Sequence, residues 1–232
     1  MCSLFPDNAA RAASVDTAVV ERKTVEVKTE GRILVHMCCG PCSIYPIKAM
    51  LPRMAVWGYF HNPNIHPYAE FRKRVEAAKT LAGYLSIDII CDEEYRPLPF
   101  IRALKSSIPP DASGTRPRHP PKDARCAFCY RTRLEETARA AKEMGFDCFS
   151  TSMLYSRYQY HKMIKEIGVD LAERYGILFY YEDFRDGWQE GIDRSKEMGL
   201  YRQRYCGCIY SRIERYSGKK PNKGNSLQKK AD

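Results

Sequence analysis

The stretch ILVHMCCGPC, residues Ile33–Cys42, joins an apolar run to three thiols. The run ends in two adjacent cysteines, which are followed by a Gly-Pro turn and a third cysteine. We expect a buried strand over Ile33–Met37 and a short helix over Ser43–Leu51. Because parallel α/β sheets bind ligands just beyond the carboxyl ends of their strands, the stretch predicts both an α/β fold and a thiol site.

The rest of the chain continues the alternation of strands and helices. Apolar runs predict strands at 56–60, 87–91, 146–150 and 177–181, and helical spacing predicts helices at 68–85, 100–105, 128–144, 159–175, 189–198 and 209–216. This order predicts an α/β, Rossmann-like, mostly parallel sheet with helices on both faces. We expect one catalytic domain over 31–216, a flexible extension over 1–30 and a disordered basic tail over 217–232.

One connection is too long for a plain loop. Residues 106–125, SSIPPDASGTRPRHPPKDAR, contain five prolines. A lid, a binding loop and a disordered segment all fit such a connection.

Composition and charge narrow the class of protein. The chain has 232 residues, of which 44% are hydrophobic and 28% charged, as in ordinary globular domains. No apolar run reaches the length of a membrane span, and residues 1–30 lack the pattern of a signal peptide, so we expect a cytoplasmic location. The net charge is +10; residues 1–30 carry −1 and 217–232 carry +4, which leaves +7 on 31–216. This excess favours a polyanionic partner such as nucleic acid, although charge alone does not decide it.

Seven of the ten cysteines fall into three tight groups: Cys38, Cys39 and Cys42; Cys126 and Cys129 in CAFC; Cys206 and Cys208 in CGC. We expect each group at a turn or helix start, where amide groups stabilise thiolates. In a reducing compartment, such clusters indicate metal binding or catalysis. Cys2, Cys91 and Cys148 stand alone. Cys91 and Cys148 end or interrupt apolar strands and are expected to be small buried hydrophobes.

Seven grouped thiols exceed the four that a tetrahedral zinc or a single cubane cluster needs. The surplus favours an iron–sulfur cluster accompanied by a second metal or by a redox-active thiol pair. A zinc site remains an alternative.

Polar and aromatic segments follow three of the predicted strands: FHNPNIHP, STSMLYSRYQYHK and EDFRDGWQEGIDRS; a fourth, LYRQRYCGCIYSR, closes the domain. Their Tyr, Arg and Gln side chains can stack on nucleic-acid bases and hydrogen-bond with base edges. We expect His66 and His119 to be solvent-exposed loop residues. His161 fits a helix face and a site equally well.

With these segments in view, the chain resembles the QueH family of cobalamin-independent epoxyqueuosine reductases. The resemblance covers residues 32–216 and rests on VHMCCGPCS (Val35–Ser43), YFHNPNIHP (Tyr59–Pro67), FRKR (Phe71–Arg74), RCAFCYRTRLEETA (Arg125–Ala138), FSTSMLYSRYQYH (Phe149–His161) and the segment Asp183–Ser211. The pairing of HMCCGPC with LYRQRYCGC is far more specific than a lone C-x-x-C.

The resemblance implies a fold similar to the adenine-nucleotide α-hydrolase (PP-loop) fold, with CCGPC replacing its phosphate-binding turn. It also implies a [4Fe-4S] cluster and a tRNA carrying epoxyqueuosine at the wobble position. Six cysteines have an invariant role in the family pattern: Cys38, Cys39, Cys126, Cys129, Cys206 and Cys208. That pattern allows a carboxylate at the position of Cys42, which fits a ligand of a second metal, such as an adjacent mononuclear iron.

The implied reaction, epoxide to alkene, needs electrons from a small donor protein, ferredoxin or flavodoxin, and an acid that protonates the leaving oxygen. Tyr158, His161 and Asp183 are the candidate acids. Two rival functions stay open: a PP-loop tRNA thiolation enzyme with a cluster, and a zinc-stabilised RNA-binding module without chemistry.

Overall fold

A computed structural model of the chain describes residues 31–110 and 112–217. Five parallel strands form one sheet in the order β3-β2-β1-β4-β5. The strands are β1 (Arg32–His36), β2 (Ala55–Phe60), β3 (Ile89–Cys91), β4 (Cys148–Thr151) and β5 (Leu178–Phe179). The predicted α/β class with a parallel sheet is confirmed. The likeness to the PP-loop fold stays a prediction with which this topology is compatible.

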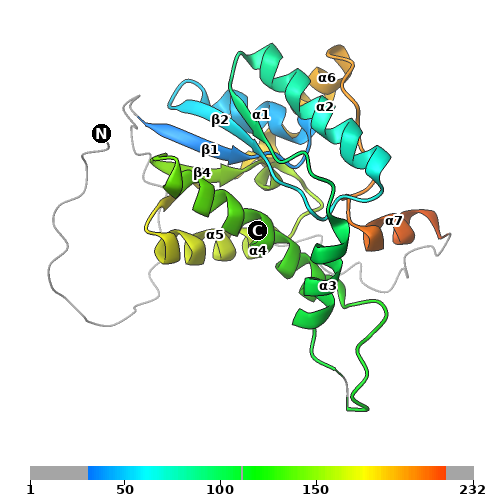
Figure 1. Cartoon of the computed structure of the whole chain (residues 1–232). Coiled ribbons are helices and arrows are strands. Elements are labelled where there is room, and N and C mark those ends of the chain that lie inside the picture. Colours follow the sequence, from blue (N-terminus) through cyan, green and yellow to red (C-terminus); the bar gives the residue numbers. More distant parts are fainter. Residues whose placement is uncertain (1–30, 111, 218–232) are drawn as a thin grey trace, which may run out of the picture.

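Helices cover both faces of the sheet (Figure 1). On one face α1 packs against α2 and α6, and on the other α4 packs against α5. The helices are α1 (Gly40–Met50), α2 (Tyr68–Leu85), α3 (Pro97–Ser107), α4 (Lys122–Glu143), α5 (His161–Tyr175), α6 (Trp188–Glu197) and α7 (Ile209–Tyr216), with 3₁₀ turns η1 (Ser152–Tyr155) and η2 (Phe184–Gly187).

The centre of the sheet is β1, which pairs with β2 on one side and β4 on the other. The order in which strands are added to the sheet reverses here, because β1 continues into α1 on one face whereas β4 leads to α5 on the other. The carboxyl ends of β1 and β4 therefore form the switch point at which open α/β sheets bind ligands. The three thiols of CCGPC follow β1 directly.

A large core cluster spans both faces of the sheet, and its members include Leu34, Phe60, Leu81, Leu134 and Phe149. A second, smaller cluster lies beside it and consists of Phe100, Leu104, Ile108, Cys129 and Tyr210. This smaller cluster attaches α3 and α7 to α4. It surrounds Cys129, one of the grouped cysteines, with apolar side chains.

Helix α4 differs most from its predicted bounds. It begins at Lys122, six residues before the predicted start at Phe128. The polar first turns contain too few apolar residues to show a helical stripe, so their helicity depends on tertiary contacts. As a consequence, the CAFC cysteines lie within a helix, and the expectation that they occupy a turn or helix start is wrong.

Other predictions lie partly outside the described residues. The extension over 1–30 and the tail over 218–232 belong to the part that the structure does not describe, and the domain division stays a prediction. Of the two lone cysteines that are described, Cys148 is buried and Cys91 is half-buried. No helix among the described residues is long and apolar enough to cross a membrane.

Candidate metal centre

The first thiol group sits at the start of α1. Cys39 is the N-cap of this helix, with extended backbone, and its sulfur accepts a hydrogen bond from the Cys42 amide at 3.4 Å. Gly40 lets the turn approach α2, since a Cβ atom there would lie 2.5 Å from the carbonyl oxygen of Ala77. The Cys38 amide donates to Ser152 Oγ at 3.1 Å, which ties the turn to the end of β4.

We call Cys38, Cys39 and Cys42 the thiol trio. Their sulfurs all lie within 4.8 Å of one another, and 3.8 Å separates those of Cys38 and Cys39. Four sulfurs around one tetrahedral metal, at metal–sulfur bonds of about 2.3 Å, lie about 3.8 Å apart. The trio therefore has the spacing of a mononuclear site in which three ligands come from the protein.

A glutamine supports the trio from the C-terminal segment. Gln203 Nε2 donates to Cys39 Sγ at 2.9 Å and to Cys42 Sγ at 3.1 Å. Outer hydrogen bonds of this kind orient metal ligands and tune their basicity. The side-chain amide oxygen of Gln203, Oε1, is buried and has no hydrogen-bond partner among the described residues.

The trio is built to share negative charge. Hydrogen bonds from Cys39, Cys42 and Ser152 stabilise a thiolate at Cys38 and hold the pKa of Cys38 well below its usual value. Burial raises the pKa of Cys39, and the hydrogen bonds to Cys38 and Cys39 raise the pKa of Cys42. The first proton thus leaves easily and the others are retained until a cation compensates the charge.

The other four grouped cysteines line one small cavity. We call them the thiol quartet: Cys126 and Cys129 from α4, and Cys206 and Cys208 from the segment before α7. Apolar and aromatic side chains complete the cavity, namely Phe100, Leu104, Tyr130 and Tyr210, together with Arg125. Burial raises the pKa of Cys126 to about 11 and that of Cys129 to about 12. These thiols are protonated near neutral pH unless a metal displaces their protons.

A buried ion pair fixes the CGC segment. Arg74, only 1% exposed, donates to Glu70 at 2.8 Å and to the carbonyl oxygens of Tyr205 and Cys206 at 2.8 and 3.0 Å. Gly207 has a φ of 123°, and a Cβ atom there would lie 3.0 Å from the Arg74 guanidinium. The glycine between the two cysteines is therefore required by backbone conformation and by space.

A second buried arginine connects the two thiol groups. Burial alone would lower the pKa of Arg133, but attraction to Cys129, Cys206 and Cys38 outweighs it and raises the pKa. The guanidinium therefore interacts with members of both the trio and the quartet. Its Nη2 atom is buried without a hydrogen-bond partner in the described part of the chain.

Further buried polar atoms near the strand ends have no hydrogen-bond partner within residues 31–110 and 112–217: His36 Nε2, Asn62 Oδ1, and Asn64 Nδ2 and Oδ1. Burial and Arg133 lower the pKa of His36 to about 3, so this imidazole is neutral. Unpartnered buried polar groups are costly and occur where a ligand or ion supplies the missing partner. Together with seven soft thiol ligands, these atoms fit a resident metal group, and thiolates select iron–sulfur clusters or zinc.

The candidate acids occupy two places. His161, at the start of α5, pairs with Asp183 Oδ1 at 3.4 Å and also contacts Leu154 O and Tyr181. Burial lowers the pKa of His161, and hydrogen bonds from Arg185 lower that of Asp183. Tyr158 is 80% exposed and packs edge-on against Trp188. None of the three donates a hydrogen bond to a cysteine sulfur in the described part of the chain.

Two histidines were expected to be exposed loop residues. His119 is exposed, as predicted. His66 is half-buried, so that expectation is wrong: its Nδ1 is 2.7 Å from the Tyr95 hydroxyl, and its carbonyl oxygen accepts from Tyr205 at 2.5 Å. His66 thereby joins the loop after β2 to the CGC segment.

Aromatic side chains border the trio. Tyr155 stacks on Trp188 with ring centroids 5.2 Å apart and donates to its carbonyl oxygen. The charges of Cys42 and Cys39 contribute, after burial, to the raised pKa of Tyr155. Arg157 lies over the Trp188 ring. An indole with an exposed tyrosine and an arginine beside it is a suitable platform for an unstacked base.

Sequence reasoning missed the residues that support the sulfurs. Gln159 Nε2 lies 3.6 Å from Cys206 Sγ, and Gln203 contacts the trio, whereas the sequence suggested base contacts for such side chains. Arg74 and Arg133 lie in segments that carry the family resemblance, but the sequence assigned no role to either. The usable signal was the placement of Gln203 three residues before Cys206 in one segment.

The fold and site define the class: a Rossmann-like α/β protein whose switch point carries a cysteine-rich site able to hold metal. The chain belongs to the QueH family, because the family model described as epoxyqueuosine reductase QueH matches residues 33–214. The predicted resemblance is confirmed.

Named relatives agree with this family. An epoxyqueuosine reductase QueH of Thermotoga maritima is 37% identical over 191 residues, which cover 80% of this chain and 92% of the relative. The protein of the same name from Dehalococcoides mccartyi is 32% identical over 192 residues, which cover 82% and 97%. A third, from Haemophilus influenzae, is 33% identical over 184 residues, which cover 78% and 71%.

Proposed function

We propose that this chain is an epoxyqueuosine reductase that converts epoxyqueuosine at the tRNA wobble position to queuosine. The observation that carries the proposal is the placement of the seven grouped cysteines in a chain of this family: the trio follows β1 at the switch point of the sheet, and the quartet lines one cavity. The reaction consumes two electrons and two protons and releases the epoxide oxygen as water. A small electron-donor protein, a ferredoxin or a flavodoxin, supplies the electrons, and the thiol chemistry suits the reducing cytoplasm.

We further propose a division of the cysteines. The quartet holds the [4Fe-4S] cluster, because four thiols around one apolar cavity match the ligand set of a cubane. The trio holds the adjacent mononuclear iron, because its compact spacing suits one ion and leaves a coordination position open for substrate. When bound, these groups supply single electrons and a Lewis acid near the epoxide.

The chain's own residues then have separate tasks. Gln203 holds the sulfurs of Cys39 and Cys42 in place through its two hydrogen bonds. Trp188, with Tyr155 behind it, provides an aromatic surface for the modified base close to the trio. Arg133 compensates the negative charge between the trio and the quartet. Each task depends on a contact that the protein makes by itself.

The three candidate proton donors, Tyr158, His161 and Asp183, differ in charge and in exposure. The lowered pKa of Asp183 leaves it ionised near neutral pH, so it orients His161 instead of donating a proton. His161 is neutral because burial lowers its pKa. Tyr158, whose side chain packs against Trp188, is the most exposed of the three candidates and so the most accessible to a bound tRNA. We therefore assign proton donation to Tyr158, with His161 as the second candidate.

The rival functions have less support. A thiolation enzyme of the PP-loop class needs a phosphate-cradling turn, and the first turn here is filled by three thiols. A zinc-stabilised RNA-binding module needs four thiols and leaves the trio without a role.

One experiment tests the function directly. Anaerobically purified protein with reconstituted iron and sulfide is incubated with epoxyqueuosine-containing tRNA and a reduced flavodoxin. Digestion of the tRNA and mass analysis should show a nucleoside lighter by one oxygen. Unchanged nucleoside in the presence of full iron would refute the proposal, and a colourless protein with tightly bound zinc would favour the binding module.

A further inference from the structure

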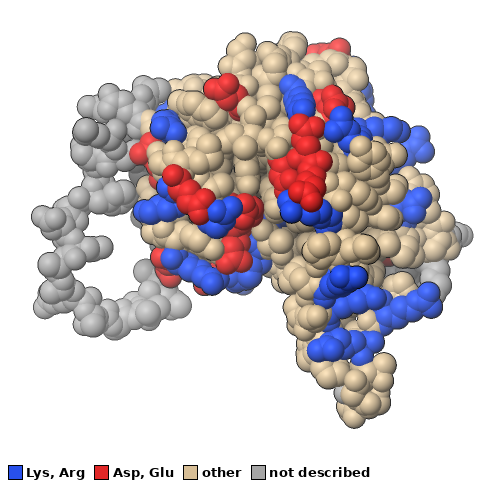
Figure 2. Space-filling view, in the orientation of Figure 1, with Lys and Arg blue, Asp and Glu red and all other residues tan. Residues whose placement is uncertain are grey.

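Helix α3 and the segment that follows it form an arm that projects from the body of the protein (Figure 1). We call residues 97–110 and 112–122 the basic arm. Its described part carries five cationic side chains and no acidic one: Arg102, Lys105, Arg116, Arg118 and Lys122. Figure 2 shows Lys and Arg side chains gathered over this arm without Asp or Glu beside them.

The arm differs from the other helices in how few of its cations lie near a carboxylate. On α2, α4, α5 and α6, surface cations mostly pair with carboxylates, as Arg72 does with Glu93 and Arg131 with Asp170. The five cations of the arm form no ion pair with any described acidic residue, and all five are exposed. Their charge is thus available to a partner.

The arm is held in place beside the thiol quartet. The inner side of α3 contributes Phe100 and Leu104 to the cavity that the quartet lines. Arg116 Nε donates to the carbonyl oxygen of Ile108 at 3.0 Å, and Arg125 Nη1 donates to that of Pro120 at 3.4 Å. These two bonds hold the segment between α3 and α4 in place. The side chains of Arg102, Lys105 and Arg118 stay exposed.

The chemistry of the outer side favours phosphate over a protein partner. Arg102 and Lys105 are three residues apart on one face of α3, and Arg118 and Lys122 continue the positive charge. Leu98 is the single large exposed hydrophobic residue within the described part of the arm. Protein interfaces need an apolar or aromatic centre, whereas phosphate contacts need only cations and backbone donors.

We propose that the basic arm binds the phosphate backbone of the tRNA substrate and so positions the anticodon next to the thiol groups. This inference rests on the proposed function, which requires a tRNA at this edge of the sheet. The arm supplies affinity and register without reading sequence, and recognition of the modified base is left to the site.

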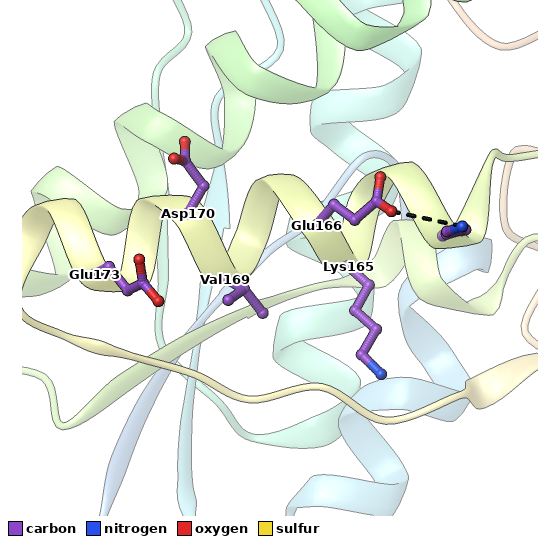
Figure 3. A pocket seen from close by; sticks show the side chains of 6 residues that line it. Lys165, Glu166, Val169, Asp170 and Glu173 are labelled. Carbon is purple, nitrogen blue, oxygen red and sulfur yellow. Dashed lines mark ion pairs between the residues drawn. The ribbon is translucent and has the colours of Figure 1, made fainter. Parts of the chain in front are cut away.

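The test compares two triple variants of equal charge. The arm variant carries Arg102→Gln, Lys105→Gln and Arg118→Gln, three side chains without a hydrogen bond or ion pair among the described residues. The control carries Arg131→Gln, Lys162→Gln and Arg174→Gln, whose side chains pair with Asp170, Glu166 and Glu135. Figure 3 shows the acidic side chains along a shallow depression on α5, Glu166, Asp170 and Glu173. Both variants lose three positive charges, so a nonspecific charge effect is equal in the two.

Binding of epoxyqueuosine-containing tRNA to the iron-loaded proteins is measured between 50 and 200 mM salt. Each phosphate contact contributes about 0.7–0.9 to the slope of log affinity against log salt, so the arm variant should lose about 2–3 units of slope. We expect binding about tenfold weaker or more at 50 mM salt. The control should stay within about twofold of the unsubstituted protein, because its cations already pair with carboxylates of the protein. The three single Gln variants of the arm should each lose a smaller part.

Equal affinities and slopes for the arm and control variants would overturn the inference. So would normal tRNA binding combined with slower electron uptake from reduced flavodoxin, since the arm would then dock an acidic protein. If the proposed function is wrong, the unsubstituted protein will leave the epoxide intact. That result is independent of the binding measurement, in which the salt dependence of tRNA binding still tests the role of the arm.

Discussion

Replacement of Gly40 by alanine should destabilise the protein and disturb the thiol trio. A Cβ atom at this position would lie 2.5 Å from the carbonyl oxygen and 2.9 Å from the carbonyl carbon of Ala77, both backbone atoms of α2. Neither atom can rotate away, so the start of α1 must move by about 0.9 Å to reach ordinary contact distance. Overpacking of this kind costs about 1–3 kcal/mol. The gain in helix propensity is small at the first residue of a helix.

The free energy of unfolding is best measured by urea denaturation of the metal-free protein, because bound metal would add its own stabilisation. With an m-value of about 2 kcal/mol/M, a loss of 1–3 kcal/mol lowers the midpoint by about 0.5–1.5 M. A Co²⁺ titration, followed by thiolate-to-cobalt absorption, should also show weaker binding at the trio, since Cys39 and Cys42 flank the displaced residue.

Gly83 provides the matched control. It lies in α2, and a Cβ atom there would meet nothing within 4 Å. Gly83→Ala should therefore raise the free energy of unfolding, by about 0.5 kcal/mol, and leave cobalt binding unchanged. If Gly40→Ala matches the unsubstituted protein in midpoint and in cobalt affinity, then α1 and α2 do not hold the trio through this contact, and the reasoning is wrong.

Four further predictions concern the site. Cys42→Ala should lose the mononuclear metal and most activity but keep the visible absorbance of the cluster, whereas Cys42→Asp should retain both; full activity with unchanged iron in the alanine variant would show that six cysteines suffice. Gln203→Met should weaken metal binding at the trio about 10–100-fold, measured by chelator competition, while Gln189→Met, which removes an exposed amide on α6, serves as the unaffected control. Metal-free protein should lose stability as pH rises above about 9, because the pKa of Cys129 is raised to about 12 in the folded state and the unfolded thiol ionises first; Cys129→Ser should flatten this dependence in urea titrations at pH 7–10. Trp188→Leu should raise KM for the tRNA about tenfold or more without loss of iron, if the indole stacks on the substrate base, and an unchanged KM would exclude that contact.

Most helices and strands of the fold can be predicted from the amino-acid sequence. Strand and helix patterns are local, because a period of two or of 3.6 residues is visible within each segment. The run Ile33–Met37 therefore predicted β1 to within one residue at each end, and α2 and α7 matched their predicted bounds. The parallel order followed from the alternation of strands with helices. The grouping of seven cysteines and the family resemblance were also evident from the chain alone.

The division of the seven grouped cysteines into a trio and a quartet depends on the tertiary structure. Cys129 and Cys206 are far apart in sequence, and their shared cavity depends on the packing of α3, α4 and α7. The contact of Gln203 with the trio likewise joins residues more than 160 positions apart. The start of α4 at Lys122 could not be predicted, because the polar first turns contain no apolar stripe. These turns are stabilised by tertiary packing. Local sequence patterns determine which segments form helices and strands. The order of the strands in the sheet determines which distant side chains come together, because it places the carboxyl ends of β1 and β4 side by side.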